Sequence, residues 1–344
     1  MPMMWIGLDV HKSFTTAGGL DPATGQVLEL GEVPTRQDDL IAVLRQLRDP
    51  KTVVLEAGRS SWAVAGWLEA AADQVWVVDP GEVRRLQHRL PKSDRRDAGA
   101  LARLAAKGLL EPIWHPDAKT LHLRELTRGR IALVRMSTRA RNMIRSLCAR
   151  HGQELPPSDL LSAAQQQRLK SLPLPAYAQL CLESLLEQLR SLQPVLERFA
   201  EPMKREAAAH AQAQRLMTIP GIGEYLGLTI AVEIGDISRF PTPAHLRSYS
   251  GLCPRVHASA GRTHHGPITK AGNKWLRWAL VMAAQQVANS RHRYDPKLKA
   301  VLLRTAFRSG RNPGKIACAR ALLDLIYHLE THQENWQPPP AKAA

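Results

Sequence analysis

Residues 4–9 read Met-Trp-Ile-Gly-Leu-Asp, an apolar run that ends on an acid. Such a run is typical of a buried strand whose last residue reaches the rim of a sheet. A second run of this kind, Thr-Val-Val-Leu-Glu at 52–56, follows a helical pattern at 38–47. The expected elements up to residue 109 are strands at 3–9, 27–33, 52–56 and 75–78, a glycine-rich turn at 18–25, and helices at 38–47, 62–72, 82–89 and 95–109. This alternation predicts an α/β domain.

The charge of the chain indicates its partner. The 344 residues carry a formal net charge of +16, and the length favours two or three domains. Nucleic acid is the commonest polyanionic partner of so basic a protein, and a membrane surface is the alternative. No apolar run reaches the roughly 18 residues of a spanning helix, and the amino terminus lacks a signal sequence. We therefore expect a cytoplasmic protein whose scattered cysteines stay reduced.

Four acids are candidate metal ligands. Asp9 and Glu56 end the two apolar strands, and Asp94 and Asp97 lie three residues apart on one helical face. Carboxylate oxygens are the ligands that Mg²⁺ prefers, and a pair of ions held in this way would bind a nucleic-acid phosphate. The alternative is structural, because Asp94 and Asp97 could cap a helix and Asp9 could be a turn residue. Taken together in an α/β pattern, the four acids predict a ribonuclease H-like metal site.

A basic helical pattern runs from about residue 121 to 150. Its arginines are Arg124, Arg128, Arg130, Arg135, Arg139, Arg141, Arg145 and Arg150. Because Glu125 is the one acid in this run, pairs within the helix cannot neutralise it. Arg135, Arg139 and Arg145 fall on neighbouring turns. This face therefore either binds a nucleic-acid backbone or is a solvated outer face.

A second long helical pattern follows a proline-rich linker at 155–175. Its apolar residues alternate three and four apart, with Pro194 between them: Leu182, Leu185, Leu189, Leu192, Leu196 and Phe199. This spacing is that of a coiled-coil seam, so we expect an antiparallel coiled-coil arm or a dimer contact. An amphipathic helix on its own domain is the alternative. The polar and proline-rich tail beyond Leu329 is expected to be unstructured.

The region from 215 to 329 holds two further candidate sites. In the turn at 218–224, Gly221 and Gly223 could leave backbone N–H groups free for a phosphate, as in a helix-hairpin-helix; a tight turn without a ligand is the alternative. Ser259 lies among small residues, where a serine is either a nucleophile or a turn former. The cations around it that could bind phosphate are Arg255, Arg262, Lys270, Lys274 and Arg277.

These motifs resemble those of transposases of the insertion sequence 110 family, over almost the whole chain. The acidic motifs are Gly-Leu-Asp-Val-His-Lys at 7–12, Leu-Glu-Ala-Gly at 55–58 and Lys-Ser-Asp-Arg-Arg-Asp-Ala at 92–98. The carboxy-terminal motifs are Ile-Pro-Gly-Ile-Gly at 219–223, Gly-Leu-Cys-Pro at 251–254 and Lys-Ala-Gly-Asn-Lys-Trp-Leu-Arg at 270–277. Ser259 falls at the family's serine, although Ala260 stands where the family usually has glycine.

The resemblance implies a RuvC-like (ribonuclease H fold) DEDD domain at 1–118, a long basic helix and coiled-coil arm at 119–214, a mainly helical transposase domain at 215–330 with a helix-hairpin-helix-like segment, and a disordered tail at 331–344. It implies DNA cleavage and rejoining for a prokaryotic mobile element, at the nucleoid. In that reaction Asp9, Glu56, Asp94 and Asp97 hold Mg²⁺, and Ser259 forms a covalent phosphoserine link.

The resemblance also implies a structured noncoding bridge RNA that pairs with donor and target DNA, and homodimers that assemble into tetramers. Two alternatives stay open. One is a metal-only, junction-resolving nuclease in which Ser259 is structural. The other is a noncatalytic nucleic-acid-binding protein whose acids are helix caps.

Overall fold

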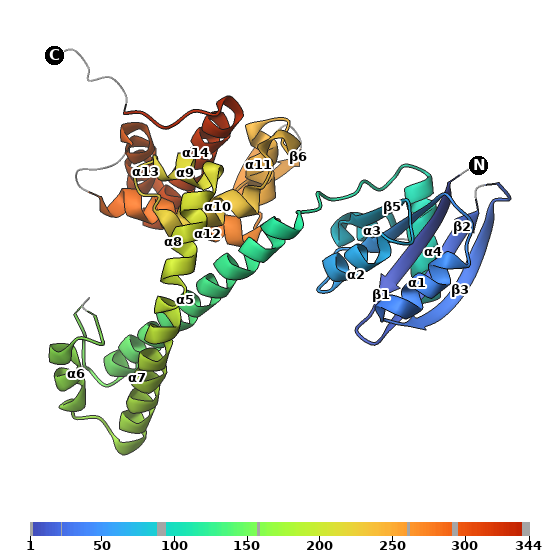
Figure 1. Ribbon diagram of the computed structural model, residues 1–344. Helices are drawn as coiled ribbons and strands as arrows, with labels where there is room; N and C mark the ends of the chain where they lie inside the picture. Colours follow the sequence, from blue (N-terminus) through green and yellow to red (C-terminus); the bar gives the residue numbers. More distant parts are fainter. Residues whose placement is uncertain are drawn as a thin grey trace, which may run out of the picture. The chain divides into compact units, whose positions relative to one another are not determined.

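The computed structural model describes residues 3–21, 23–87, 94–156, 159–259, 262–290 and 295–338, and within these ranges the side chains of residues 87, 94–96, 256–259 and 262–265 lie outside the description. The chain folds as two compact units, Met1–His115 and Pro116–Ala344. Figure 1 follows the chain from the strands of the first unit to the helices of the second. None of the described helices is long and apolar enough to cross a membrane.

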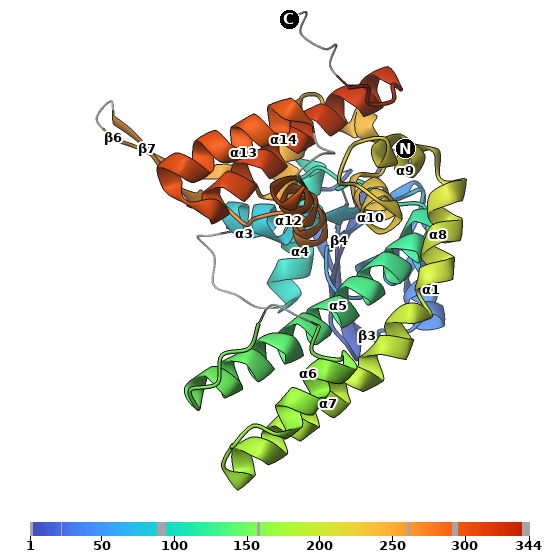
Figure 2. The same ribbon diagram turned by 90° about the vertical axis from the view of Figure 1, so that its left-hand side faces the viewer.

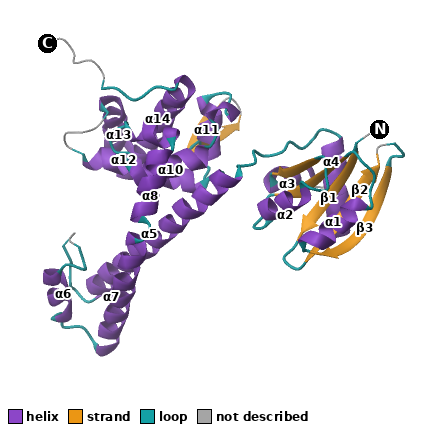
Figure 3. Cartoon of the chain, in the orientation of Figure 1, coloured by secondary structure: helices purple, strands orange, loops and turns teal. Residues whose placement is uncertain are grey.

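The first unit is built on a five-stranded mixed sheet. Its strands are β1 (Met4–Val10), β2 (Phe14–Asp21), β3 (Gln26–Pro34), β4 (Lys51–Glu56) and β5 (Gln74–Val78), in the order β3-β2-β1-β4-β5. β2 pairs antiparallel with β1 and β3, whereas β4 pairs parallel with β1 and β5. The expected α/β class is confirmed, and Figure 3 shows its strands and helices by colour.

The turn expected at 18–25 is wrong in its first half. Gly18 and Gly19 belong to β2, where they pair with Gly7 and Ile6 of β1, and β2 continues to Asp21. Two adjacent glycines indicate a turn when they are considered alone. Here Gly18 instead makes room for a helix that lies close to the sheet, which local composition cannot reveal.

Helices cover both faces of this sheet. α1 (Gln37–Arg45) and α2 (Ser61–Leu68) pack with one face, and α3 (Pro80–Gln87) and α4 (Asp94–Ala106) pack with the other. Side chains alternate along a strand, so Leu55 clusters with Leu44 and Leu68 on the first face. Its neighbour Val54 clusters with Leu101 on the second face. This alternation determines on which face of the sheet the acid at the end of each strand lies.

In the second unit, α5 (Ala118–Arg150) and α7 (Ala176–Glu197) form an antiparallel pair, the arm, with α6 (Ala163–Lys170) packed at its end. Near that end, Ile144 of α5 shares a buried cluster with Leu182 and Leu189 of α7. Toward the start of α5, Gly129 lies against Phe199, which follows α7. Figures 1 and 2 both show the two helices side by side. The apolar seam of α7 is therefore buried within this chain.

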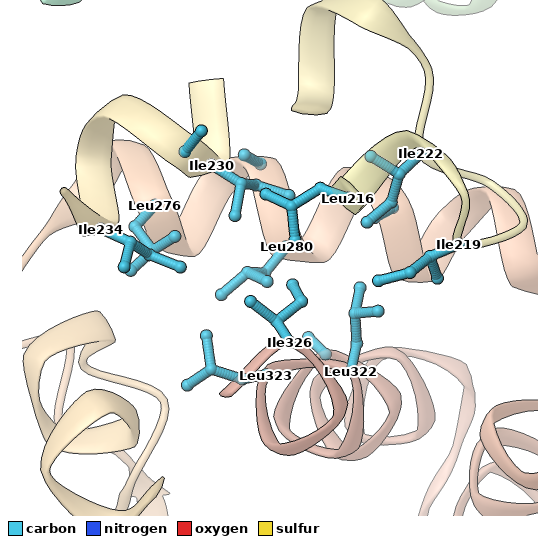
Figure 4. Packing of buried hydrophobic residues seen from close by; sticks show 14 of the residues in the cluster. Leu216, Ile219, Ile222, Ile230, Ile234, Leu276, Leu280, Leu322, Leu323 and Ile326 are labelled. Atoms are coloured by element: carbon cyan, nitrogen blue, oxygen red, sulfur yellow. The ribbon is translucent and has the colours of Figure 1, made fainter. Parts of the chain in front are cut away.

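The rest of the second unit is a helical domain with a hairpin. Its helices are α8 (Ala200–Ala209), α9 (Ala211–Met217), α10 (Glu224–Ile234), the 3-10 turn η1 (Ile237–Arg239), α11 (Pro243–Ser250), α12 (Lys274–Asn289), α13 (Pro296–Ser309) and α14 (Arg311–His332). Leu216, Ile230, Leu280 and Ile326 are fully buried in the core between α9, α10, α12 and α14 (Figure 4). The hairpin strands β6 (Pro254–Ser259) and β7 (Arg262–Ile268) pair antiparallel and were not expected from the sequence.

The end of the chain is more ordered than expected. α14 continues to His332, so the helix passes residue 331. The backbone and indole N–H groups of Trp336 donate to Thr218 Oγ1 and Asp295 Oδ2, both at 2.9 Å. The prediction of a disordered tail is therefore wrong for this part, because Trp336 has partners that are far away in the sequence. Residues 339–344 lie outside the described ranges.

Candidate functional site

Asp9 and Glu56 lie side by side at the carboxyl ends of two parallel strands. The register pairs Leu8 of β1 with Leu55 of β4, so the next residue of each strand is an acid. Leu8 and Leu55 belong to the cluster shared with α1 and α2. By alternation, the two acids lie on the opposite face of the sheet, which α4 covers. Two acids that are far apart in sequence thus share one edge and one face.

Glycines let α4 lie directly on this face. A Cβ built on Gly7 of β1 would meet the carbonyl oxygen of Ala98 at 1.9 Å. A Cβ built on Gly18 of β2 would meet the backbone nitrogen of Gly99 at 2.8 Å. Real Cβ atoms essentially never come closer than 3.0 Å to another heavy atom. The approach of α4 to the sheet therefore depends on glycine at these positions.

The direction of α4 brings its acids to the same end of the sheet. Ala105, late in α4, clusters with residues that include Trp5, early in β1, whereas Ala98, nearer the start of α4, lies against Gly7, so the helix runs antiparallel to β1. Its first turns, which contain Asp94 and Asp97, therefore lie toward the strand ends that carry Asp9 and Glu56. Asp97 lies one turn before Leu101, on the side of α4 that packs against the sheet. The side chain of Asp94 lies outside the description.

His11 is a further residue of this site, and it was not among the residues predicted from the sequence. Its Nε2 lies 3.2 Å from Asp9 Oδ2, and its ring centroid lies 4.7 Å from that of Phe14. Residues two apart on an extended chain point to the same side, and this spacing is the signal that could have found it. At this distance the His11 ring can restrict the orientation of the Asp9 carboxylate.

The donor set suits a hard cation, because carboxylate oxygens are the ligands that Mg²⁺ prefers. Among the described side chains, however, no three His, Cys, Asp or Glu residues are grouped closely enough to hold an ion. The fold brings β1, β4 and the start of α4 together without gathering three described ligands around one point. The site as it stands is thus two adjacent strand-end acids with the acid-bearing turn of α4 on the same face.

Ser259 is the last residue of β6 and pairs with Arg262 of β7. The expectation of a small-residue loop is corrected, since the serine is the last residue of a strand; residues 260–261, between the two strands in the sequence, lie outside the described ranges. Figure 2 shows the hairpin projecting from the helical domain. Cross-strand hydrogen bonds make such a hairpin, and no period of apolar residues predicts them here.

Two glycines shape the base of this hairpin. Gly251 and Gly272 have φ angles of 67° and 110°, a region that favours glycine. A Cβ on Gly251 would meet Ala271 O at 2.4 Å, and one on Gly272 would meet Tyr249 O at 2.3 Å. Substituting either glycine would therefore displace the backbone that leads into β6 or out of β7.

The cations expected around Ser259 fall into different environments. Arg255 and Lys270 are exposed, so both are available to a phosphate. Arg277 donates from Nη1 to Ser250 O at 2.9 Å and so holds the start of the hairpin. Burial, with a smaller contribution from the charge of Arg135, lowers the pKa of Arg277. The side chain of Arg262 lies outside the description.

Family models match both units of the chain. A DEDD transposase model matches residues 6–151, and a model described as the transposase IS116/IS110/IS902 family matches residues 213–306. The chain belongs to the IS110 family of transposases. The chain is thus an enzyme that recombines DNA, and DNA is its partner.

Three relatives show how far the similarity extends. The transposase for insertion sequence element IS1111A of Coxiella burnetii is 28% identical over 261 residues, 72% of this chain and 68% of its own. The transposase for insertion sequence element IS1328 of Yersinia enterocolitica is 27% identical over 240 residues, 69% of this chain and 70% of its own. The pilin gene-inverting protein of Moraxella bovis is 26% identical over 245 residues, 70% of this chain and 68% of its own.

Two arginines of the transposase that were expected to bind nucleic acid instead bind groups of the protein itself. Arg128 makes a bidentate pair with Glu233 at 2.6 and 2.8 Å. Arg124 is buried and donates to Val232 O and Glu233 O at 2.8 and 3.3 Å. Burial lowers the pKa of Arg124, and the Glu233 carboxylate opposes that shift. The prediction for these two residues is corrected, because their acidic partner lies in another helix, more than a hundred residues later in the chain.

Glu233 connects several elements through its contacts, which the sequence did not reveal; Glu233 with its partners Arg124, Arg128 and Asn273 is here called the hub. Its side chain is fully buried, and Asn273 Nδ2 donates to its Oε2 at 2.7 Å. The Asn273 side-chain oxygen accepts from the N–H groups of Trp275 and Leu276 and so caps α12. The hub therefore joins α5, α10 and the start of α12, where the hairpin returns to the core.

The remaining basic candidates of the transposase keep more accessible positions. Arg135 and Arg139 are exposed on α5, and Arg145 is half-buried. Arg135 Cζ lies 5.2 Å, and Lys274 Nζ lies 5.1 Å, from the ring centroid of Trp275. These residues stay predicted contacts for a nucleic-acid backbone.

The glycine turn between α9 and α10 is present as expected. α9 ends at Met217, α10 begins at Glu224, and Gly221 has a φ of 94°. Gly221 and Gly223 line a hollow of about 790 Å³ beside α12. The turn thus borders open space, which suits a ligand but does not by itself identify one.

Proposed function

We propose that this transposase cuts and rejoins DNA through a covalent link to Ser259, with Asp9, Glu56, Asp94 and Asp97 holding two Mg²⁺ ions. The observation that carries the proposal is the register that sets Asp9 beside Glu56, together with α4 starting over the same face. The two strand-end acids lie side by side on the face that α4 covers, an arrangement that a set of unrelated turn residues would not require.

In the proposed step the Ser259 hydroxyl attacks a backbone phosphorus. A bond from Oγ to phosphorus forms, and the bond from phosphorus to a deoxyribose oxygen breaks. The serine loses its proton and the leaving sugar oxygen takes one up, so the products are a phosphoserine link and a free sugar hydroxyl. Arg255 and Lys270, exposed at the base of the hairpin, are placed to bind phosphate oxygens. When bound, Mg²⁺ would supply positive charge that offsets the charge developing on the phosphate.

We further propose that a structured noncoding bridge RNA chooses the donor and target sites, and that the active species is a homodimer that assembles into a tetramer. The support for nucleic-acid binding is the charge of +16 and the exposed Arg135 and Arg139, which suit backbone contacts; the oligomeric state rests on the family resemblance alone. Base pairing then reads the sequence, and the protein needs no base-specific side chains. Changing the pairing segment of the RNA should move the insertion site accordingly; insertion that ignores the change would contradict RNA guidance.

The chemistry is tested by trapping the covalent intermediate. The protein is incubated with Mg²⁺, end-labelled element DNA and RNA transcribed from the flanking noncoding segment, and then run on a denaturing gel. We expect a protein–DNA adduct from the unchanged chain and none from Ser259→Ala or Asp97→Asn. Ser309→Ala removes an exposed serine of α13 and should leave the adduct unchanged. Cleavage by Ser259→Ala at the normal rate, without an adduct, would instead support the metal-only nuclease.

A further inference from the structure

A groove runs between α5 and α12 of the second unit. Two hollows of about 550 and 790 Å³ adjoin there, and Val134, Trp278 and Met282 line both of them. A smaller hollow of about 300 Å³ shares Arg139 and Met143 with the first and continues along α5. The three hollows therefore form one continuous surface, here called the α5–α12 groove.

The chemistry of this groove is apolar walls with a cationic rim. Trp278, Met282 and Met143 supply a flat ring and two flexible side chains, and Met143 is 46% exposed. Arg135 and Arg139 line the same hollow. Among the described residues that line the three hollows, none is an aspartate or a glutamate. An apolar surface of this kind with only positive charge around it is complementary to an anionic, partly aromatic ligand.

Arg130 lies against an aromatic ring of the same groove. Its guanidinium carbon lies 3.6 Å from the ring centroid of Tyr225, and both residues line the larger hollow. Its Nε is buried without a hydrogen-bond partner. Burial lowers the pKa of Arg130, and Tyr225 opposes that shift. Arg130 thus adds positive charge to the wall of the larger hollow.

We propose that the α5–α12 groove binds unpaired nucleotides of a nucleic-acid strand, with bases against Trp278 and the methionines and phosphates at Arg135 and Arg139. Bases offer flat apolar faces, whereas the paired bases of a duplex have those faces covered by stacking. The glycine turn at 221–223 borders the same groove and adds backbone N–H groups at its edge. The proposal deepens the nucleic-acid binding proposed above, and it depends on neither Ser259 nor Mg²⁺.

The test is binding without chemistry. Fluorescence anisotropy in EDTA compares labelled oligo(dT), oligo(rU) and a DNA duplex of the same length. Met143→Glu puts an acid into the groove at an exposed position, and it should weaken binding of a single strand about tenfold or more, with little change for the duplex. The arm with the larger loss, oligo(dT) or oligo(rU), identifies the strand that occupies the groove.

Leu303→Glu is the matched control, because Leu303 is 55% exposed on α13, away from the groove. It makes the same apolar-to-acid change and should leave single-strand binding unchanged. Oligonucleotides that carry 5-iodouracil should crosslink to groove residues such as Trp278 or Met282 in the unchanged chain, which keeps the test decisive if Met143→Glu folds poorly. Equal binding by the two variants, crosslinks elsewhere, or a change in sedimentation alone with Met143→Glu would overturn the proposal. The last result would identify the groove as a contact between copies of this chain.

Discussion

Replacing Gly7 by alanine should move α4 off the sheet and damage the acidic site without touching any acid. A Cβ at this position would lie 1.9 Å from the Ala98 carbonyl oxygen, and real Cβ atoms essentially never come within 3.0 Å. The helix must therefore retreat by about 1 Å. Overpacking of this kind costs about 1–3 kcal/mol, and each 1 kcal/mol lowers the Tm of a domain of this size by roughly 4 °C.

The same movement should lower activity more than it lowers stability. Asp97 directly precedes Ala98, so the retreat carries it away from Asp9 and Glu56. A misplacement of about 1 Å in a catalytic constellation can cost on the order of a hundredfold in rate. We expect the rate of covalent adduct formation to fall by about that factor for Gly7→Ala at temperatures where the variant is still folded.

A graded series separates this reasoning from a general intolerance of substitution. The nearest heavy atoms to a new Cβ lie at 2.8 Å for Gly18 and at 3.5 Å for Gly19, so the loss of Tm should decrease from Gly7→Ala to Gly18→Ala to Gly19→Ala. Gly66→Ala lies in α2 with no atom within 4 Å, and it should raise stability by up to about 1 kcal/mol through helix propensity. Differential scanning calorimetry measures the series. An unchanged Tm and adduct rate for Gly7→Ala would refute the argument.

Three further predictions concern the second unit. Arg124→Gln should lower the free energy of unfolding in urea by about 2–3 kcal/mol because a buried ionic contact is lost, yet it should leave the salt dependence of DNA binding unchanged. Arg139→Gln should make the salt dependence of DNA binding shallower and leave the free energy of unfolding unchanged. Glu233→Gln leaves two guanidinium groups without their anion and should cost about 3–5 kcal/mol in the same urea assay, so an unchanged midpoint would contradict the hub. Burial raises the pKa of Cys318 to about 11, so at pH 8 its thiolate fraction is on the order of a thousandth. Mass spectrometry after iodoacetamide treatment should therefore find exposed Cys181 alkylated and Cys318 unmodified until the pH approaches 11 or the protein unfolds.

The sequence predicted those elements whose signal is local. The apolar runs that end on Asp9 and Glu56 are strands, and the helical spacing around Leu182 and Leu189 belongs to a helix. The turn at 218–224, predicted from its glycines, lies between two helices as expected. In each case the evidence sits within a few neighbouring residues, and a strand or helix repeats it with a short period.

Features that depend on partners far along the chain were missed or misjudged. Arg124 resembled a nucleic-acid contact until Glu233, more than a hundred residues later, proved to be close to it. Trp336 resembled part of a free tail, although Asp295 accepts its indole N–H. Gly18 resembled a turn residue because the helix that lies against it comes much later in the chain. Composition carries no record of such pairs.

By itself, then, the sequence determined which residues could carry the chemistry: the strand-end acids, the acid pair of α4, and Ser259 among its cations. Which of the acids lie next to one another depends on the tertiary structure of the first unit. The parallel register of β1 and β4 sets Asp9 beside Glu56, and the glycine contact at Gly7 brings α4 onto their face. The tertiary structure also decided which arginines pair with Glu233 and which remain exposed. The physical reason is that backbone pairing, close packing and burial of charge join residues by distance in space, whereas sequence patterns record only distance along the chain.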